Sequence, residues 1–261
     1  MLIGRKLFLL LLAAVLAPAA FYLWREPNTD QPQTAPAPAI IPEPSIRYPV
    51  EGLGPTADSL PPLSDSDDTI HRAVTALVGK RLESLLISED MIRRVVATID
   101  NLSRDHLSAQ LMPVKPVSGL TLTMETDAGV AIARENAARY RPYVRIAQAV
   151  PTDKLVALYA RFYPLFQQQY QALGYADGYF NDRIVQVIED LLATPDVSEP
   201  LLLVQPRVLY EFADPTLQNL SAGQKILLRM GAENREEAKA KLREIRKALI
   251  AGNAAGDFSV P

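Results

Sequence analysis

The apolar positions divide the chain into three parts with different patterns. Residues 7–24 carry no charge, and residues 26–64 contain ten of the 21 prolines. From about residue 65, apolar side chains recur every three or four positions, a period that predicts amphipathic helices around a core. The pattern predicts one mainly α domain with minor β content over residues 65–251, and a flexible tail over 252–261.

The first part has the length and the flanks of a transmembrane helix. It runs from Leu7 through Leu16 to Trp24, and a helix of that length covers about 27 Å, close to the thickness of the hydrocarbon core of a bilayer. Two basic residues precede it, so the positive-inside rule predicts a cytoplasmic N-terminus. We therefore expect a single-pass signal anchor over residues 1–25 that inserts in the lipid bilayer of a bacterial inner membrane and leaves the domain in the periplasm.

A cleaved signal peptide is the alternative interpretation of this segment. Ala17 and Ala19 fit the small-residue pattern of a cleavage site. Apolar residues nevertheless continue through Trp24, which favours the uncleaved anchor. Both interpretations predict that the rest of the chain is exported.

Residues 26–64 have the composition of a linker. Their prolines remove backbone donors and hold φ near the polyproline II value, and few large apolar residues are available to offset the entropy of ordering. We expect a disordered tether that separates the domain from the membrane. A proline-rich ligand for a partner module is the alternative.

Six helices are expected in the domain. Ser88 and Ser221 are candidate N-caps, Gly174 is a candidate helix end, and Pro164 should bend the longest helix. In the second helix, Asp100 falls on the polar side. The expected helices cover residues 66–85 with a break at Gly79, 88–102, 152–173, 181–193, 221–231 and 234–251.

Two further segments carry other patterns. Residues 120–124 alternate as a short strand does, and they either pair with a segment such as 201–204 or form an extended arm. The last helix carries nine charged residues between Arg235 and Lys247, a run typical of a solvated face, and Glu237 with Lys241 forms a favourable i,i+4 pair. A surface for a partner is the alternative for this run.

Composition and charge narrow the functional classes. The net charge is −3, from 27 basic and 30 acidic residues, which argues against a nucleic-acid partner. The absence of cysteine excludes disulfides, thiolate metal sites and cysteine nucleophiles. Common catalytic and nucleotide-binding motifs are missing, and a grouping of Ser103, Asp105 and His106 is too ordinary for a loop to indicate a triad. We expect no metal and no cofactor.

The candidate site lies at a corner between two helices, residues 173–183. Glycines, aromatic rings, acids and a guanidinium are crowded there, an arrangement that suits a small concave site for a sugar or a peptide. The alternative is a helix–loop–helix corner whose aromatic rings pack beneath it. The candidate binding residues are Tyr175, Asp177, Tyr179, Asn181, Asp182 and Arg183.

Four strings of the sequence resemble a bacterial protein family. They are LLISEDMIRRVVATIDNL (85–102), LGYADGYFNDR (173–183), VLYEFADP (208–215) and LSAGQKILLRMG (220–231). They are similar to the family known as domain of unknown function 3014, and the resemblance covers most of residues 65–251. It implies one domain behind an N-terminal membrane segment and a proline-rich spacer, and it implies no activity.

Together these patterns favour a non-enzymatic role. We expect a tethered module that binds an envelope protein or a cell-wall polymer. The alternative is an envelope hydrolase that cleaves sugar or peptide bonds with paired carboxylates, for which Asp177, Asp182 and Glu189 are the candidates.

Overall fold

The structure is a computed structural model that describes residues 46–255 except 52, 54–58, 80–84 and 118. The described residues belong to one compact unit, Pro44–Pro261. The predicted anchor, with Leu7, Leu16 and Trp24, lies outside the described residues, as does most of the predicted linker. Among the helices that are described, none is both long enough and apolar enough to cross a bilayer.

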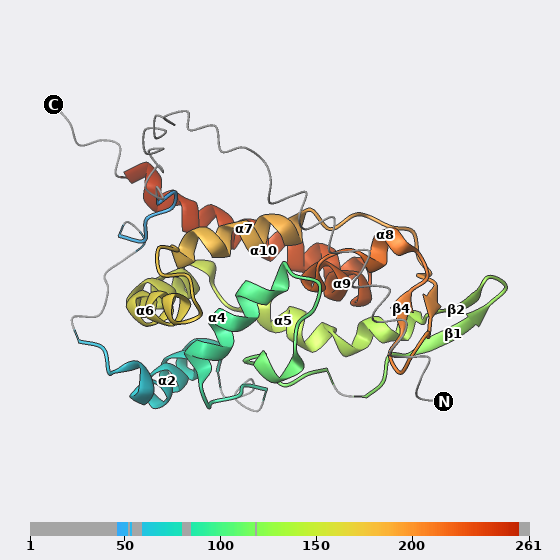
Figure 1. The fold of residues 1–261 in the computed structure, drawn as a ribbon, viewed down its shortest axis with the longest axis horizontal. Coiled ribbons are helices and arrows are strands. Elements are labelled where there is room, and N and C mark those ends of the chain that lie inside the picture. The colour runs from blue at the N-terminus through green and yellow to red at the C-terminus, as the bar shows by residue number, and fades with distance from the viewer. Residues whose placement is uncertain (1–45, 52, 54–58, 80–84, 118, 256–261) are drawn as a thin grey trace, which may run out of the picture. The chain divides into compact units, whose positions relative to one another are not determined.

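The described part of the chain is mainly helical with minor strand content, which confirms this part of the predicted fold class (Figure 1). Short 3-10 turns join several of the elements. The helices are α2 (Asp67–Val78), α4 (Met91–Leu102), α5 (Arg141–Ala149), α6 (Thr152–Ala172), α7 (Phe180–Leu192), α8 (Pro215–Gln218), α9 (Ala222–Arg229) and α10 (Ala232–Ala255). Of these, α5 and the short α8 are missing from the sequence prediction, and α6 continues through Pro164.

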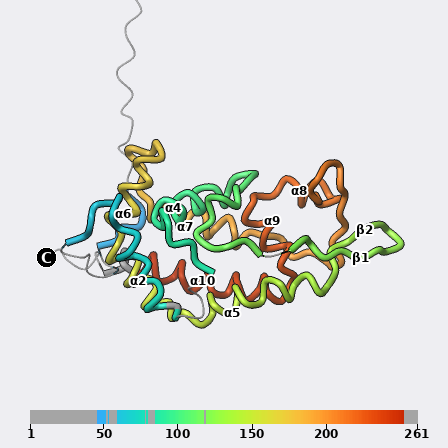
Figure 2. The backbone as a smooth tube through the Cα atoms, turned by 90° about the horizontal axis from the view of Figure 1, so that it is seen from below, coloured from blue at the N-terminus to red at the C-terminus, as the bar shows by residue number. Residues whose placement is uncertain are grey.

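Two central helices organise the packing. Helix α10 contacts α5, α6, α7 and α9, while α4 contacts α2, α6, α7 and α9. Figure 2 shows the same arrangement from below, with the β1–β2 hairpin at the end away from α6. The largest apolar cluster lies among α2, α4, α6 and α7, where Val96, Phe162 and Phe180 are almost completely buried.

The start of α4 depends on a contact from another helix. Ser88 is not its N-cap, because the helix begins at Met91 and Asp90 takes the N-cap position with a φ of 54°. The carboxylate of Asp67 in α2 accepts hydrogen bonds from the backbone N–H groups of Asp90 at 2.7 Å and Met91 at 2.9 Å. These N–H groups are among those that a helix leaves unpaired, so a long-range acceptor sets where α4 begins.

The strands form two antiparallel ribbons. Strand β1 (Thr123–Thr126) pairs with β2 (Gly129–Ile132), and β3 (Leu203–Val204) pairs with β4 (Glu211–Phe212). The predicted strand therefore lies a few residues later than expected and finds a local partner, because a short hairpin loop costs little entropy to close. A single bridge between Ala131 and Leu202 joins the two ribbons, so segment 201–204 is a neighbour of the hairpin but not the partner of β1.

The charged run of α10 is not wholly a solvated face. Arg235, Lys239 and Lys241 are 3–5% exposed. The ammonium of Lys239 donates to the carbonyl of Thr194, just after α7, and that of Lys241 donates to the carbonyl of Val150, the C-cap of α5. The expectation of full solvation is wrong because helix C-termini present unpaired carbonyls and a partial negative charge, both of which suit a buried cation.

The end of the predicted linker is packed on the domain. We call residues 46–51 the strap. Val50 of the strap is 2% exposed and belongs to the main apolar cluster, against which Leu53, Leu60 and Leu63 also pack. The structure differs from the predicted linker here, because these few apolar side chains find an apolar surface on α6 and α7.

Candidate functional site

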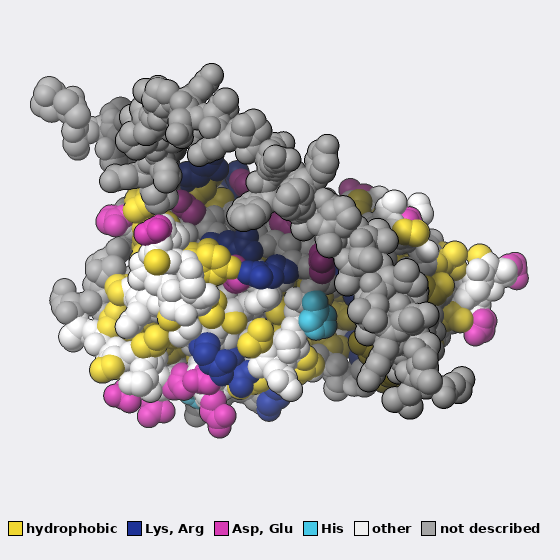
Figure 3. Space-filling view, in the orientation of Figure 1, with side chains coloured by type: hydrophobic (Ala, Val, Ile, Leu, Met, Phe, Trp, Pro, Cys, Tyr) yellow, Lys and Arg dark blue, Asp and Glu magenta, His cyan; other side chains and the backbone are white. Residues whose placement is uncertain are grey.

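Two adjoining depressions follow one side of α7. One has a volume of about 580 Å³ and the other of about 340 Å³, and both are lined by Tyr170, Arg183 and Gln186. We call the pair the α7 groove. Figure 3 shows Lys and Arg side chains grouped in the middle of the face drawn there, between α4 and α7. The α7 groove contains most of the residues of the candidate site.

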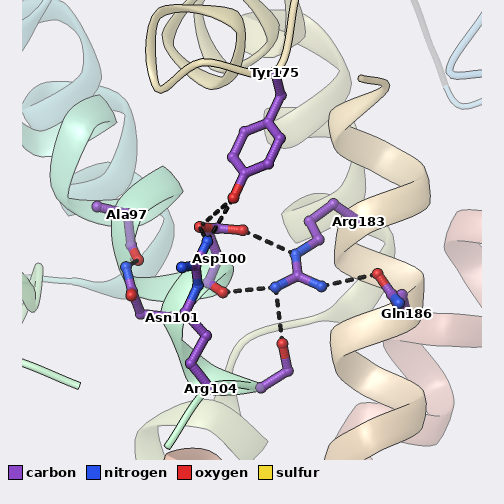
Figure 4. Close-up of polar contacts among 8 residues, drawn as sticks. Ala97, Asp100, Asn101, Arg104, Tyr175, Arg183 and Gln186 are labelled. Atoms are coloured by element: carbon purple, nitrogen blue, oxygen red, sulfur yellow. Dashed lines mark hydrogen bonds and ion pairs between the residues drawn. The ribbon is translucent and has the colours of Figure 1, made fainter. Parts of the chain in front are cut away.

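A buried carboxylate lies at the centre of the larger depression (Figure 4). The side chain of Asp100 in α4 is 5% exposed. Its Oδ1 accepts a hydrogen bond from Arg183 Nε at 3.0 Å, and its Oδ2 accepts from Arg104 Nη2 at 2.7 Å and from the Tyr175 hydroxyl at 3.1 Å. Two guanidinium groups therefore compensate one buried charge, as a charge inside a protein requires.

The two arginines differ in how much of their side chains is exposed to solvent. Arg183 is 16% exposed, and its guanidinium also donates to the Asp100 carbonyl at 2.7 Å and to Gln186 Oε1 at 2.8 Å. Arg104 is 51% exposed, and the nearby charge of Asp100 raises the pKa of its guanidinium further above the ordinary value. Arg183 holds the network together, whereas the guanidinium of Arg104 remains half-exposed at the surface.

The smaller depression adjoins the strap. Side chains at the start of α7 bind the main chain of the strap with four hydrogen bonds of 2.8–3.0 Å. Both carboxylate oxygens of Asp182 accept backbone N–H groups, the amide of Asn181 donates to a carbonyl, and the Tyr179 hydroxyl accepts an N–H. The strap atoms are the N–H groups of Arg47, Tyr48 and Val50 and the carbonyl of Tyr48. These bonds hold the main chain of the strap, which bends at Arg47, Tyr48 and Val50, while the side chains of Val50 and Tyr48 pack into apolar clusters of the domain.

The candidate residues of the corner are divided between the Asp100 network and the contacts with the strap. Tyr175 and Arg183 belong to the Asp100 network, Tyr179, Asn181 and Asp182 hold the strap, and Asp177 is exposed. The sequence analysis missed the two α4-side members of the network, Asp100 and Arg104. Asp100 is the one carboxylate among residues 91–102, which is a signal, but the pattern predicts that it lies on the polar side of that helix.

The grouping of Ser103, Asp105 and His106 is not brought together as a triad. Ser103 lines the α7 groove, where its hydroxyl accepts a hydrogen bond from Arg183 Nη2 at 2.8 Å. Asp105 and His106 line a different depression, beside α9. These positions do not support nucleophilic catalysis.

The carboxylates proposed for a hydrolase are engaged in other contacts. Asp182 holds the strap, and Glu189 pairs with Arg246 of α10 at 2.7 Å. Asp177 does not line the α7 groove. Within the described residues, no group of three or more His, Asp or Glu side chains is placed to hold a metal ion.

The buried tyrosines Tyr159 and Tyr163 are expected to make the folded domain less stable at alkaline pH. Burial raises the pKa of Tyr159 and of Tyr163 well above the ordinary value near 10. Because only the unfolded chain ionises these phenols readily, their contribution to stability is complete below about pH 10 and is lost as the pH rises further. We expect the last part of the tyrosinate absorbance, that of the buried phenols, to appear above pH 10 only together with the loss of helical circular dichroism. Ordinary titration of every tyrosine in a folded domain would contradict this.

Comparisons with known proteins place the chain in one family. No curated protein and no solved structure matches it. A family model, that of Protein of unknown function (DUF3014), matches residues 91–246, which include every described residue of the α7 groove outside the strap. Since this match covers more than half of the chain, the protein belongs to the DUF3014 family.

Proposed function

We propose that the chain is a single-pass inner-membrane protein whose domain acts in the periplasm as a non-enzymatic binding module of the cell envelope. The uncharged segment 7–24, preceded by basic residues, supports the anchor and its orientation. The α7 groove supports the binding role. Its proposed ligand is a segment of an envelope protein that carries a carboxylate.

One observation supports this proposal: the groove already binds a peptide segment at one end and is open at the other. The strap is held through main-chain hydrogen bonds, a mode of recognition that another peptide segment can use. The open end presents the exposed guanidinium of Arg104 and the partly exposed ring of Tyr175, one face of which stacks on the buried ring of Tyr170 with centroids 4.5 Å apart. A guanidinium suits a ligand carboxylate, and aromatic faces suit peptide groups.

The chemistry of the groove favours binding over hydrolysis. A general acid needs a setting that raises the pKa of its carboxyl group, usually an apolar pocket. Asp100 instead has two guanidinium partners, and Asp182 accepts two N–H groups. Both carboxylates are therefore occupied by other groups of the protein.

The proposal can be tested by photo-crosslinking in native membranes. A photoreactive amino acid at Gln186, which is exposed and lines both depressions, should capture a partner that mass spectrometry identifies. The same residue placed at Arg243, exposed on α10, is the positional control. Arg104→Glu should reduce capture at Gln186 at least tenfold, whereas the same charge reversal at Arg145, exposed on α5, should not.

The captured partner decides the outcome. A protein captured at Gln186, and lost with Arg104→Glu alone, supports the proposal. If cell-wall fragments are captured instead, the ligand of the groove is a cell-wall polymer and not a peptide. Equal capture at Gln186 and Arg243, or no effect of Arg104→Glu, would refute the groove as the binding surface.

A further inference from the structure

An apolar cavity of about 210 Å³ lies among α2, α4, α6 and α7. All of its lining side chains are aliphatic or aromatic, among them Val74 of α2, Val95 of α4 and Ile184 of α7. None of the lining residues belongs to the α7 groove. The cavity is therefore a separate feature from the surface of the proposed function.

The cavity is open on one side, because eight of its eleven lining residues are partly exposed. A contiguous apolar surface that is exposed in this way marks a binding groove more often than an ordinary protein surface. Its walls offer almost no polar groups to hold water, so an apolar molecule is the ligand that fits.

The arrangement of the walls indicates a long and narrow ligand. Helix α6 lines the cavity from Leu155 to Phe166, a rise of about 16 Å along the helix axis. Each of the other three helices contributes only two residues four positions apart, which is about one turn. From this geometry we infer that the cavity binds a single hydrocarbon chain, carried by a fatty acid or by a lipid.

A buried hydroxyl on the wall supports the inference. The ring of Tyr159 lines the cavity, and its hydroxyl is buried with no hydrogen-bond partner in the part of the chain that is described. A buried polar group without a partner is costly. A polar atom of the bound molecule that reached this hydroxyl would remove that cost.

Photolabelling of the full-length protein in its membranes tests the inference. The probe is a fatty acid with a diazirine near the end of its chain, and a phospholipid with the same acyl chain forms the second arm. We expect labelled peptides from α4 and α6, and competition by unlabelled fatty acids that improves about fourfold per methylene until the cavity is full. The probe that labels these helices, the fatty acid or the phospholipid, shows which kind of molecule carries the bound hydrocarbon chain.

A matched pair of variants distinguishes binding in the cavity from nonspecific adhesion of lipid to the protein surface. Val95→Phe fills the cavity and should reduce labelling at least tenfold, while Val208→Phe, in a loop where Val208 is 85% exposed, should leave it unchanged. If Val95→Phe does not fold by circular dichroism, Val74→Phe replaces it. The inference is overturned if labelling of α4 and α6 persists in the filled variant, or if neither probe labels these helices.

Discussion

Replacing Asp100 by alanine is expected to lower the free energy of unfolding by about 3–5 kcal/mol. The substitution removes the only carboxylate within hydrogen-bonding distance of Arg183 among the described residues, and that guanidinium is 16% exposed. An unpaired charge in such a setting costs far more than a lost surface ion pair. The Tyr175 hydroxyl loses its acceptor at the same time.

Thermal and urea unfolding followed by circular dichroism measure this effect. Asp177→Ala is the matched control, because the same substitution at an exposed position of the same corner should change stability by less than about 0.5 kcal/mol. Tyr175→Phe should lie between them, near 1 kcal/mol, because it deletes one hydrogen-bonding group. Equal stability of Asp100→Ala and Asp177→Ala would show that the network does not hold α4 to α7.

Gly223→Val is expected to destabilise the domain by about 3 kcal/mol, at the upper end for overpacking. Gly223 is buried in α9, and a Cβ there would clash with Leu191 Cδ2 and would lie 3.1 Å from the Leu102 carbonyl oxygen. The leucine methyl can rotate away, but the main-chain oxygen of α4 cannot. The side chain therefore forces α9 away from α4 and α7.

The same unfolding measurements test this prediction. Ala240→Val introduces valine at an exposed position inside α10 and measures only its lower helix propensity, below about 1 kcal/mol. Gly223→Val should be several times more costly. A similar loss of stability for both variants would mean that the packing of α9 against α4 and α7 does not depend on the missing side chain at position 223.

Local signals account for the helices that could be predicted. The capping box of Ser221 and Gln224 begins α9, and Gly174, with a φ of +107°, follows the end of α6. These signals involve residues a few positions apart, so they act before any tertiary contact forms. The start of α4 could not be predicted in this way, because its acceptor, Asp67, belongs to another helix.

The sequence indicated where polar and aromatic residues gather but not how they are arranged. The crowding of polar and aromatic residues at 173–183 marked the corner, and six of its residues were named as candidates. Their division between the Asp100 network and the strap depends on partners 71 to 135 positions away in the sequence. Spacing along a chain does not encode such contacts, since they form only when α4, α7 and the strap meet.

The sequence by itself determined the mainly helical character of the domain, the approximate bounds of most helices and the corner where the polar groups gather, because helical periodicity and capping are local properties. The tertiary structure alone decided which charges are buried. Asp100, Lys239 and Lys241 look like surface residues in the sequence, yet each is buried against groups supplied by other elements. The cost of burying a charge depends on the partners that surround it, and those partners are brought together only by folding.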